Sequence, residues 1–138
     1  MTTVFEKLNL KDQQEIVVLN APESFRPELA RLPVLSLHQH LESIATVSFL
    51  LAFVTKQNEV DALAAQVAAR AQGDAIVWFA YPKGTSKKYK CDFNRDTGWA
   101  GLNAAGFETV RAVAIDEDWS ALRFRRSEFV KARAKSAR

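Results

Sequence analysis

The charged residues best suited to chemistry in this chain are Lys83, Asp92, Asp96 and Asp116. A lysine shortly after a buried strand and before a helix N-terminus suits a phosphate or a carboxylate. Carboxylates can act as general acids and bases. Together the four residues give an enzymatic hypothesis, a reaction on a small anionic substrate. Aspartates also cap helices and form turns, so a purely structural role is the alternative.

Histidine and cysteine chemistry has little support. His38, His40 and Glu42 alternate, so they would share one face of an extended segment, but the chain has no further histidine. Cys91 has no histidine near it in the sequence that could serve as a base. We therefore expect no metal site and no catalytic thiol.

The three tryptophans are candidates for stacking on a ring. Trp78 lies in an apolar run and Trp99 on an apolar helix stripe, so both are expected in the core. Trp119 starts a predicted strand and shares a face with Arg123 and Arg125. We expect Trp119 to be partly exposed and to stack against these arginines.

Length and composition predict one soluble domain. The chain has 138 residues, of which 48% are hydrophobic and 25% are charged. The apolar stretch 47–54 is far too short to cross a bilayer, and the N-terminal residues do not form a signal peptide. We expect a cytoplasmic protein with no membrane partner. Residues 1–126 are predicted to be a single α/β domain, and 127–138 a basic tail that is a short helix or disordered.

The net charge of +3 is unevenly distributed along the chain. Lysines and arginines concentrate in 81–95 and in 123–138, whereas the remainder is acidic. A basic loop and a basic tail attract anions, which gives nucleic-acid binding as a second alternative function. Two solvated basic segments are the structural alternative.

Runs of apolar residues predict the strands of a sheet. The continuous runs 15–20, 47–54 and 75–80 are typical of strands buried on both faces. The short alternating run 32–37 predicts an edge strand. Two further alternating runs, separated by the turn 116–118, predict an antiparallel hairpin from 109–115 and 119–125.

Helices are predicted between these strands. The first, within 22–32, is short because proline interrupts it. The second follows Thr55 as N-cap, with Asn58 as the competing cap, and ends at Gly73.

The third helix begins at Asp92 or Asn94 and buries Trp99. It ends with Gly106 just beyond its C-terminus. The alternation of strands and helices predicts a three-layer Rossmann-like α/β domain, with a mostly parallel sheet of about six strands and a C-terminal antiparallel hairpin strand.

This order of elements resembles a shortened class I methyltransferase fold. Such enzymes bind S-adenosylmethionine at a glycine-rich turn after the first strand. Here that turn reads Asn20-Ala-Pro-Glu-Ser24, and the second strand ends in Ser36-Leu-His38 where an acidic residue would be needed. The resemblance therefore implies a degenerate form of the fold, and we expect no bound cofactor.

Several motifs are similar to a family of small bacterial proteins that is known only as a domain of unknown function. They are Tyr81-Pro-Lys83, Asp92-x-x-Arg-Asp-x-Gly-Trp99 and Asp116-x-x-Trp-Ser-Ala-Leu-Arg-Phe-Arg125. This similarity implies a bacterial source and the fold, but brings no activity with it.

Ligands of open α/β sheets bind outside the carboxyl ends of the parallel strands. The residues expected at that edge, or on the neighbouring loop and hairpin, are Asn20, Tyr81, Lys83, Asp92, Asp96, Asp116, Trp119 and Arg123. We interpret the chain as a non-enzymatic binding or regulatory domain for a small anionic ligand. The enzymatic and nucleic-acid hypotheses remain the alternatives.

Overall fold

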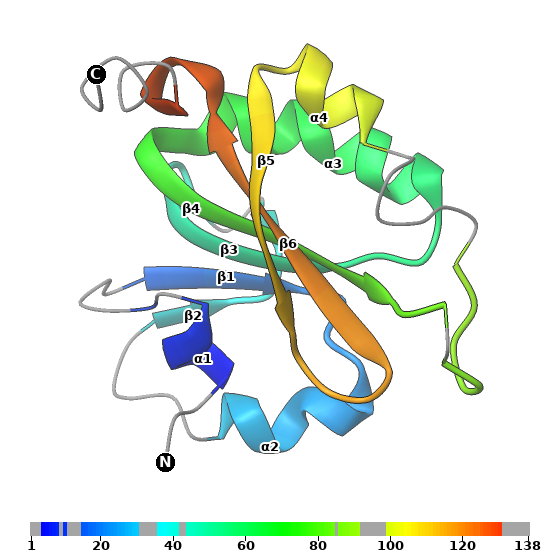
Figure 1. The fold of residues 1–138 in the computed structure, drawn as a ribbon. Coiled ribbons are helices and arrows are strands. Elements are labelled where there is room, and N and C mark those ends of the chain that lie inside the picture. The colour runs from blue at the N-terminus through cyan, green and yellow to red at the C-terminus, as the bar shows by residue number, and fades with distance from the viewer. Residues whose placement is uncertain are drawn as a thin grey trace.

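The computed structural model describes residues 4–8, 10, 15–30, 36–41, 44–84, 86–91 and 99–130. They build a six-stranded sheet in the order β2-β1-β3-β4-β6-β5 (Figure 1). The strands are β1 (Glu15–Leu19), β2 (Ser36–His38), β3 (Val47–Phe53), β4 (Ala71–Pro82), β5 (Phe107–Ala114) and β6 (Trp119–Arg126). The helices are α1 (Val4–Lys7), the 3-10 turn η1 (Glu23–Phe25), α2 (Arg26–Leu29), α3 (Gln57–Arg70) and α4 (Ala100–Ala104).

The sheet topology confirms the predicted fold class. Strands β2, β1, β3 and β4 are parallel neighbours, and β6 pairs antiparallel with both β4 and β5. Helices α3 and α4 lie on one side of the sheet, and α1 and α2 lie on the other (Figure 1). The hairpin prediction is confirmed. Strand β2 lies at the edge of the sheet as predicted, but it is described as Ser36–His38, and 32–35 of the predicted strand 32–37 lie outside the described residues.

The sheet is buried on both faces, as its continuous apolar runs indicate. In β1, Val17 and Leu19 pack toward α3 and α4, whereas Ile16 and Val18 pack toward α1 and η1. Each face forms its own apolar cluster around a shared backbone. The side chains of β3 and β4 alternate between the two clusters in the same way.

The predicted ends of α3 are wrong at both termini. Its N-cap is Lys56, so neither Thr55 nor Asn58 caps it. Glu59 supplies the cap from inside the helix, because its Oε1 accepts from the backbone N–H of Thr55 (2.9 Å) and of Lys56 (3.0 Å). At the other end the chain enters β4 at Ala71, and Gly73 adopts φ 59° within that strand.

The irregularity around Gly73 is a bulge between β3 and β4. The pairing passes from Val47↔Ala71 to Phe49↔Ile76, so β4 carries extra residues there. Asp74 in the bulge accepts two hydrogen bonds from the Arg125 guanidinium, at 2.8 and 2.5 Å. This ion pair fastens β6 to the start of β4 and raises the pKa of Arg125 further.

The C-terminal end of α4 follows its sequence signal. Gly106 has φ 98°, and Phe107 beyond it is buried. The described helix covers Ala100–Ala104 with Trp99 as N-cap, and the predicted caps Asp92 and Asn94 lie outside the described residues.

Beyond β6, residues 127–130 are helical, and the rest of the predicted tail lies outside the described part of the chain. Among the described residues, no helix is long and apolar enough to span a membrane.

The expectation that Trp119 is partly exposed is wrong. Its side chain is 3% exposed, similar to Trp99 at 5%. Its ring contacts Phe53 at 5.1 Å and Tyr89 at 4.9 Å between centroids. The reason is that β6 is an interior strand of the sheet. Its face with Trp119 is covered by the apolar cluster that also contains Phe5 of α1 and Phe25 of η1.

Trp99→Ala and Trp119→Ala should therefore be similarly destabilising. Each removes a buried ring, and we expect a loss of about 3–5 kcal/mol in the free energy of unfolding. Val110, 41% exposed on β5, is the control, and Val110→Ala should change stability by about 0.5 kcal/mol or less. Urea denaturation measures all three. A small loss for Trp119→Ala alone would contradict its role in the core.

Gly106→Ala should destabilise the fold by about 1–2 kcal/mol, because an L-residue with a side chain is strained at this φ. Gly84→Ala is the matched control, since Gly84 has neither a positive φ nor any atom near an added Cβ. Thermal unfolding of both variants tests the prediction. Equal losses would show that the conformation at Gly106 is not the cause.

Candidate ligand-binding site

The carboxyl ends of the parallel strands meet at one edge of the sheet. Asn20 follows β1, Gln39 follows β2, Thr55 lies just beyond β3 and Lys83 follows β4. Asn20 has φ 57°, a left-handed conformation that asparagine tolerates better than most residues. It turns the chain sharply out of the sheet and leaves its side chain at this edge.

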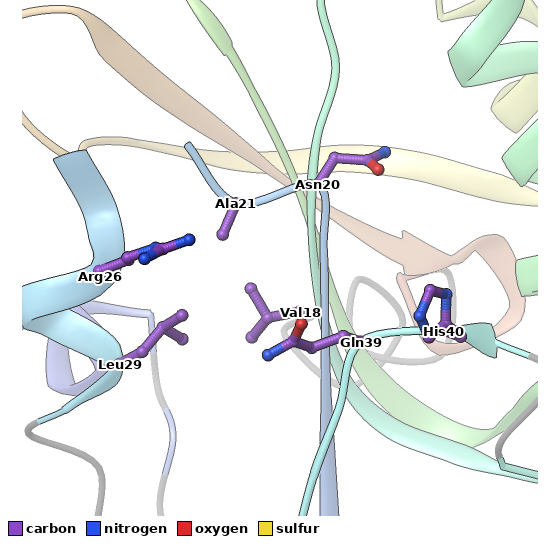
Figure 2. Close-up of a pocket in the computed structure, with 7 residues that line it drawn as sticks. All are labelled: Val18, Asn20, Ala21, Arg26, Leu29, Gln39 and His40. Carbon is purple, nitrogen blue, oxygen red and sulfur yellow. The ribbon is translucent and has the colours of Figure 1, made fainter. Parts of the chain in front are cut away.

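A first hollow, here called the arginine hollow, has a volume of about 470 Å³. Arg26 and Leu29 of α2 line one side, and the Gln39 amide lines the opposite side (Figure 2). Val18 lies between them on β1 (Figure 2). The remaining lining residues are Asn20, Ala21 and His40. The site thus offers a guanidinium and neutral hydrogen-bonding groups above an apolar wall.

A second hollow, here called the aromatic hollow, has a volume of about 270 Å³. Phe53, Tyr89, Trp119 and Pro22 supply apolar surfaces. Its polar lining residues are Asn20, Thr55 and Glu59. Asn20 lines both hollows, so the two adjoin at the turn after β1.

Hydrogen bonds hold the Tyr89 segment against the sheet. The Tyr89 N–H donates to Ser86 Oγ (3.1 Å), and that hydroxyl donates to Asp118 Oδ1 (2.8 Å). The Lys88 ammonium lies 5.5 Å from the centroid of the Tyr89 ring. The lysine-rich loop therefore brings the ring of Tyr89 to the aromatic hollow, with the Lys88 ammonium beside that ring.

Trp119 carries an unusual polar group at the same place. Its indole Nε1 is buried and has no hydrogen-bond acceptor among the described residues. Such a donor costs about 1–3 kcal/mol when it is left unpaired.

The structure brings only some of the predicted site residues to these hollows. Asn20 lines both and Trp119 lines one. Tyr81 is buried in the other apolar cluster, with its ring 5.7 Å from that of Trp99. Arg123 lies on β6, partly buried, opposite Trp78 of β4. Neither of these two lines a hollow described here.

Only two of the four residues proposed for an enzymatic role, Lys83 and Asp116, lie among the described residues. Lys83 and the turn carrying Asp116 lie at the same end of the sheet, since the Lys83 N–H donates to the Asp118 carbonyl (2.8 Å). Asp92 and Asp96 lie outside the described residues. The Asp116 Oδ1 accepts from the N–H groups of Asp118 and Trp119, both at 2.8 Å, which is the structural role of a turn aspartate.

Sequence reasoning missed Arg26, Gln39, Glu59 and Tyr89. Tyr89 had a usable signal, since an aromatic residue among lysines is a combination found where proteins bind single-stranded nucleic acid. Glu59 had one as well, at the third position after a helix start. Arg26 and Gln39 had none, because only the folded chain places them across one hollow. Among the described residues, no group of three histidine, cysteine or acidic side chains could hold a metal.

No protein-family model matches the chain, and no curated protein matches it either. Solved structures do match its fold. A SAM-dependent methyltransferase from Aquifex aeolicus superposes with a TM-score of 0.59 at 13% identity, covering 88% of this chain and 87% of that one.

Two further matches extend this comparison. The magnesium protoporphyrin IX methyltransferase of Synechocystis PCC 6803, solved with bound SAM, gives a TM-score of 0.57 at 12% identity, covering 90% and 74% of the two chains. A fibrillarin pre-rRNA processing protein from Methanococcus jannaschii gives 0.55 at 11%, covering 85% and 68%. The chain thus has a Rossmann-like, methyltransferase-like fold.

Asp116→Ala should lower the free energy of unfolding by about 1–2 kcal/mol, because two backbone N–H groups lose their acceptor. Asp116→Asn retains an acceptor oxygen and should lose less than half as much. Urea denaturation of the two variants makes the comparison. Losses near zero in both variants would contradict the turn role, whereas equal large losses would show that a neutral acceptor oxygen cannot replace the carboxylate.

Proposed function

We propose that the chain is a non-enzymatic binding domain that takes a small anionic ligand in the arginine hollow. The observation that carries the proposal is the placement of Arg26 opposite Gln39 across one hollow (Figure 2). A guanidinium presents a planar fork that matches a carboxylate or phosphate, and an amide N–H adds a further donor. Val18 and Leu29 supply an apolar wall beside the anion.

The fold suggests S-adenosylmethionine as a ligand, but the residues at this edge do not fit it. The turn after β1 is built from Asn20, Ala21 and Pro22, without a glycine that would let the backbone approach a ligand. Pro22 has no N–H to donate. Gln39 and His40 stand at the end of β2, where ribose hydroxyls would need an acidic acceptor.

An enzymatic role remains the alternative, at the end of the sheet where Lys83 and Asp116 lie. The engagement of Asp116 in its turn argues against its acting as an acid or base. The same proposal includes the source and location of the protein. We propose that it is bacterial and cytoplasmic, and that it belongs with the small domains that share the Tyr-Pro-Lys and Asp-x-x-Trp motifs.

Titration with S-adenosylmethionine or its demethylated product should give no heat of binding. The physical reason is the turn at Asn20, which lacks the glycines and donors that such a ligand requires. Isothermal titration calorimetry measures this directly. Affinity in the micromolar range would show that the site is a functioning cofactor site after all.

Citrate and inorganic phosphate are the probes for the proposed anion site. Both should bind weakly, and Arg26→Ala should lower their affinity about tenfold through the loss of a charge-assisted contact. Arg111→Ala is the matched control, because Arg111 is an exposed arginine on β5 at the opposite edge of the sheet. Chemical shifts in NMR titrations report both affinity and place. Equal effects of the two substitutions, or no binding, would refute the proposal.

A further inference from the structure

The arginine hollow places one positive charge next to an apolar wall. Arg26 and Leu29 are three residues apart in α2, so they lie on the same side of that helix. Both side chains extend from α2 toward β1, where Val18 lies (Figure 2). The hollow therefore presents a guanidinium and an aliphatic surface side by side.

The aliphatic surface is the margin of a larger apolar cluster. Val18 is 1% exposed within the cluster that also holds Phe5 and Phe25. Ala21 and Leu29 pack against this cluster but are only partly buried. A hydrocarbon group in the hollow extends the cluster and removes more of these two side chains from water, which favours its binding.

The charge of the hollow favours an anion with a single negative charge. Among the described lining residues, Arg26 alone carries a permanent charge. The segment 23–29, to which it belongs, also contains Glu23 and Glu28, so this segment is acidic overall. These carboxylates repel a doubly charged anion more strongly than a singly charged one.

The donors of the hollow match a carboxylate. The Arg26 guanidinium offers parallel N–H groups, which a carboxylate accepts with both of its oxygens. The Gln39 side-chain amide on the opposite side supplies a further donor (Figure 2). The two oxygens of a carboxylate have lone pairs enough for all of these bonds.

We propose that the ligand of the arginine hollow is an aliphatic monocarboxylate, with its carboxylate on Arg26 and its hydrocarbon chain along Ala21 and Leu29. The hollow of about 470 Å³ lies within the range of small-molecule sites, so it admits a chain of several carbons. Such a ligand has no ribose or base, so it does not require a glycine turn after β1 or an acidic acceptor after β2. This inference rests on the proposed function and specifies the chemical class of its ligand.

NMR titration of the full chain with acetate, butyrate and hexanoate tests the inference. Affinity should rise about threefold with each added methylene, because each one leaves water for the apolar wall. The methyl signals of Val18, Ala21 and Leu29 should shift, which reports the position of the chain. Hexylamine, with the charge reversed, should not bind at this place.

Two substitutions separate the charge from the wall. Arg26→Ala should weaken all three acids about tenfold and leave the gain per methylene unchanged. Leu29→Ser should reduce that gain to about twofold or less and leave acetate binding unchanged. Val110→Ser is the matched control for Leu29→Ser and should change neither quantity, since Val110 is an exposed apolar residue on β5 at the far edge of the sheet. Urea denaturation checks that Leu29→Ser folds, and Leu29→Ala repeats the test with a smaller change in polarity.

The outcomes separate this inference from the function on which it rests. If acetate binds through Arg26 but chain length has no effect, the monocarboxylate inference is overturned and the anion site stands. The same holds if phosphate binds more than about tenfold more tightly than hexanoate, because the site would then prefer a higher charge. If neither the acids nor phosphate bind, or if hexylamine binds as hexanoate does, both fall. A gain per methylene that persists in Leu29→Ser, with methyl shifts outside the hollow, would also overturn the inference, because the chain would then lie elsewhere.

Discussion

The structure depends on the burial of β1, β3 and β4 on both faces. Their side chains alternate between two apolar clusters, so the helices on one side and α1 with η1 on the other are held by the same strands. Because these strands are parallel, their carboxyl ends fall at a common edge. Burial of apolar surface is thus also what brings the turns at Asn20, Thr55 and Lys83 to one end of the sheet.

At the carboxyl edge of the parallel strands, some residues both stabilise the fold and line the candidate site. Glu59 begins α3 and lines the aromatic hollow, and Trp119 begins β6 and lines it as well. Residues with such double roles limit what substitution can reveal, because a change in binding is accompanied by a change in stability. Arg26 is free of this difficulty because it is exposed and belongs to neither apolar cluster, whereas Tyr89 packs against the cluster that contains Trp119.

The local patterns of the sequence were sufficient for the fold class. Continuous apolar runs identified the buried parallel strands, and Gly106 marked the end of α4 correctly. The site was less accessible to sequence reasoning, because hollows arise from residues far apart in the chain, such as Arg26 and Gln39. Trp119 was misjudged because a pattern of alternation shows which residues share a face, and not which strand will lie beside it. The same limit applies to Gly73, whose left-handed φ serves a bulge in β4 and not the end of a helix.

The interior position of β6 has a consequence for the order in which the sheet forms. Strand β5 precedes β6 in the chain, yet it reaches β4 only through β6. Until residues 119–126 are available, the outer edge of β4 is unpaired and β5 has no neighbour in the sheet. During synthesis the parallel half can assemble early, whereas the antiparallel half must wait for the last strand. The exposed edge of β4 is then the surface most open to chaperones or to pairing with another nascent chain.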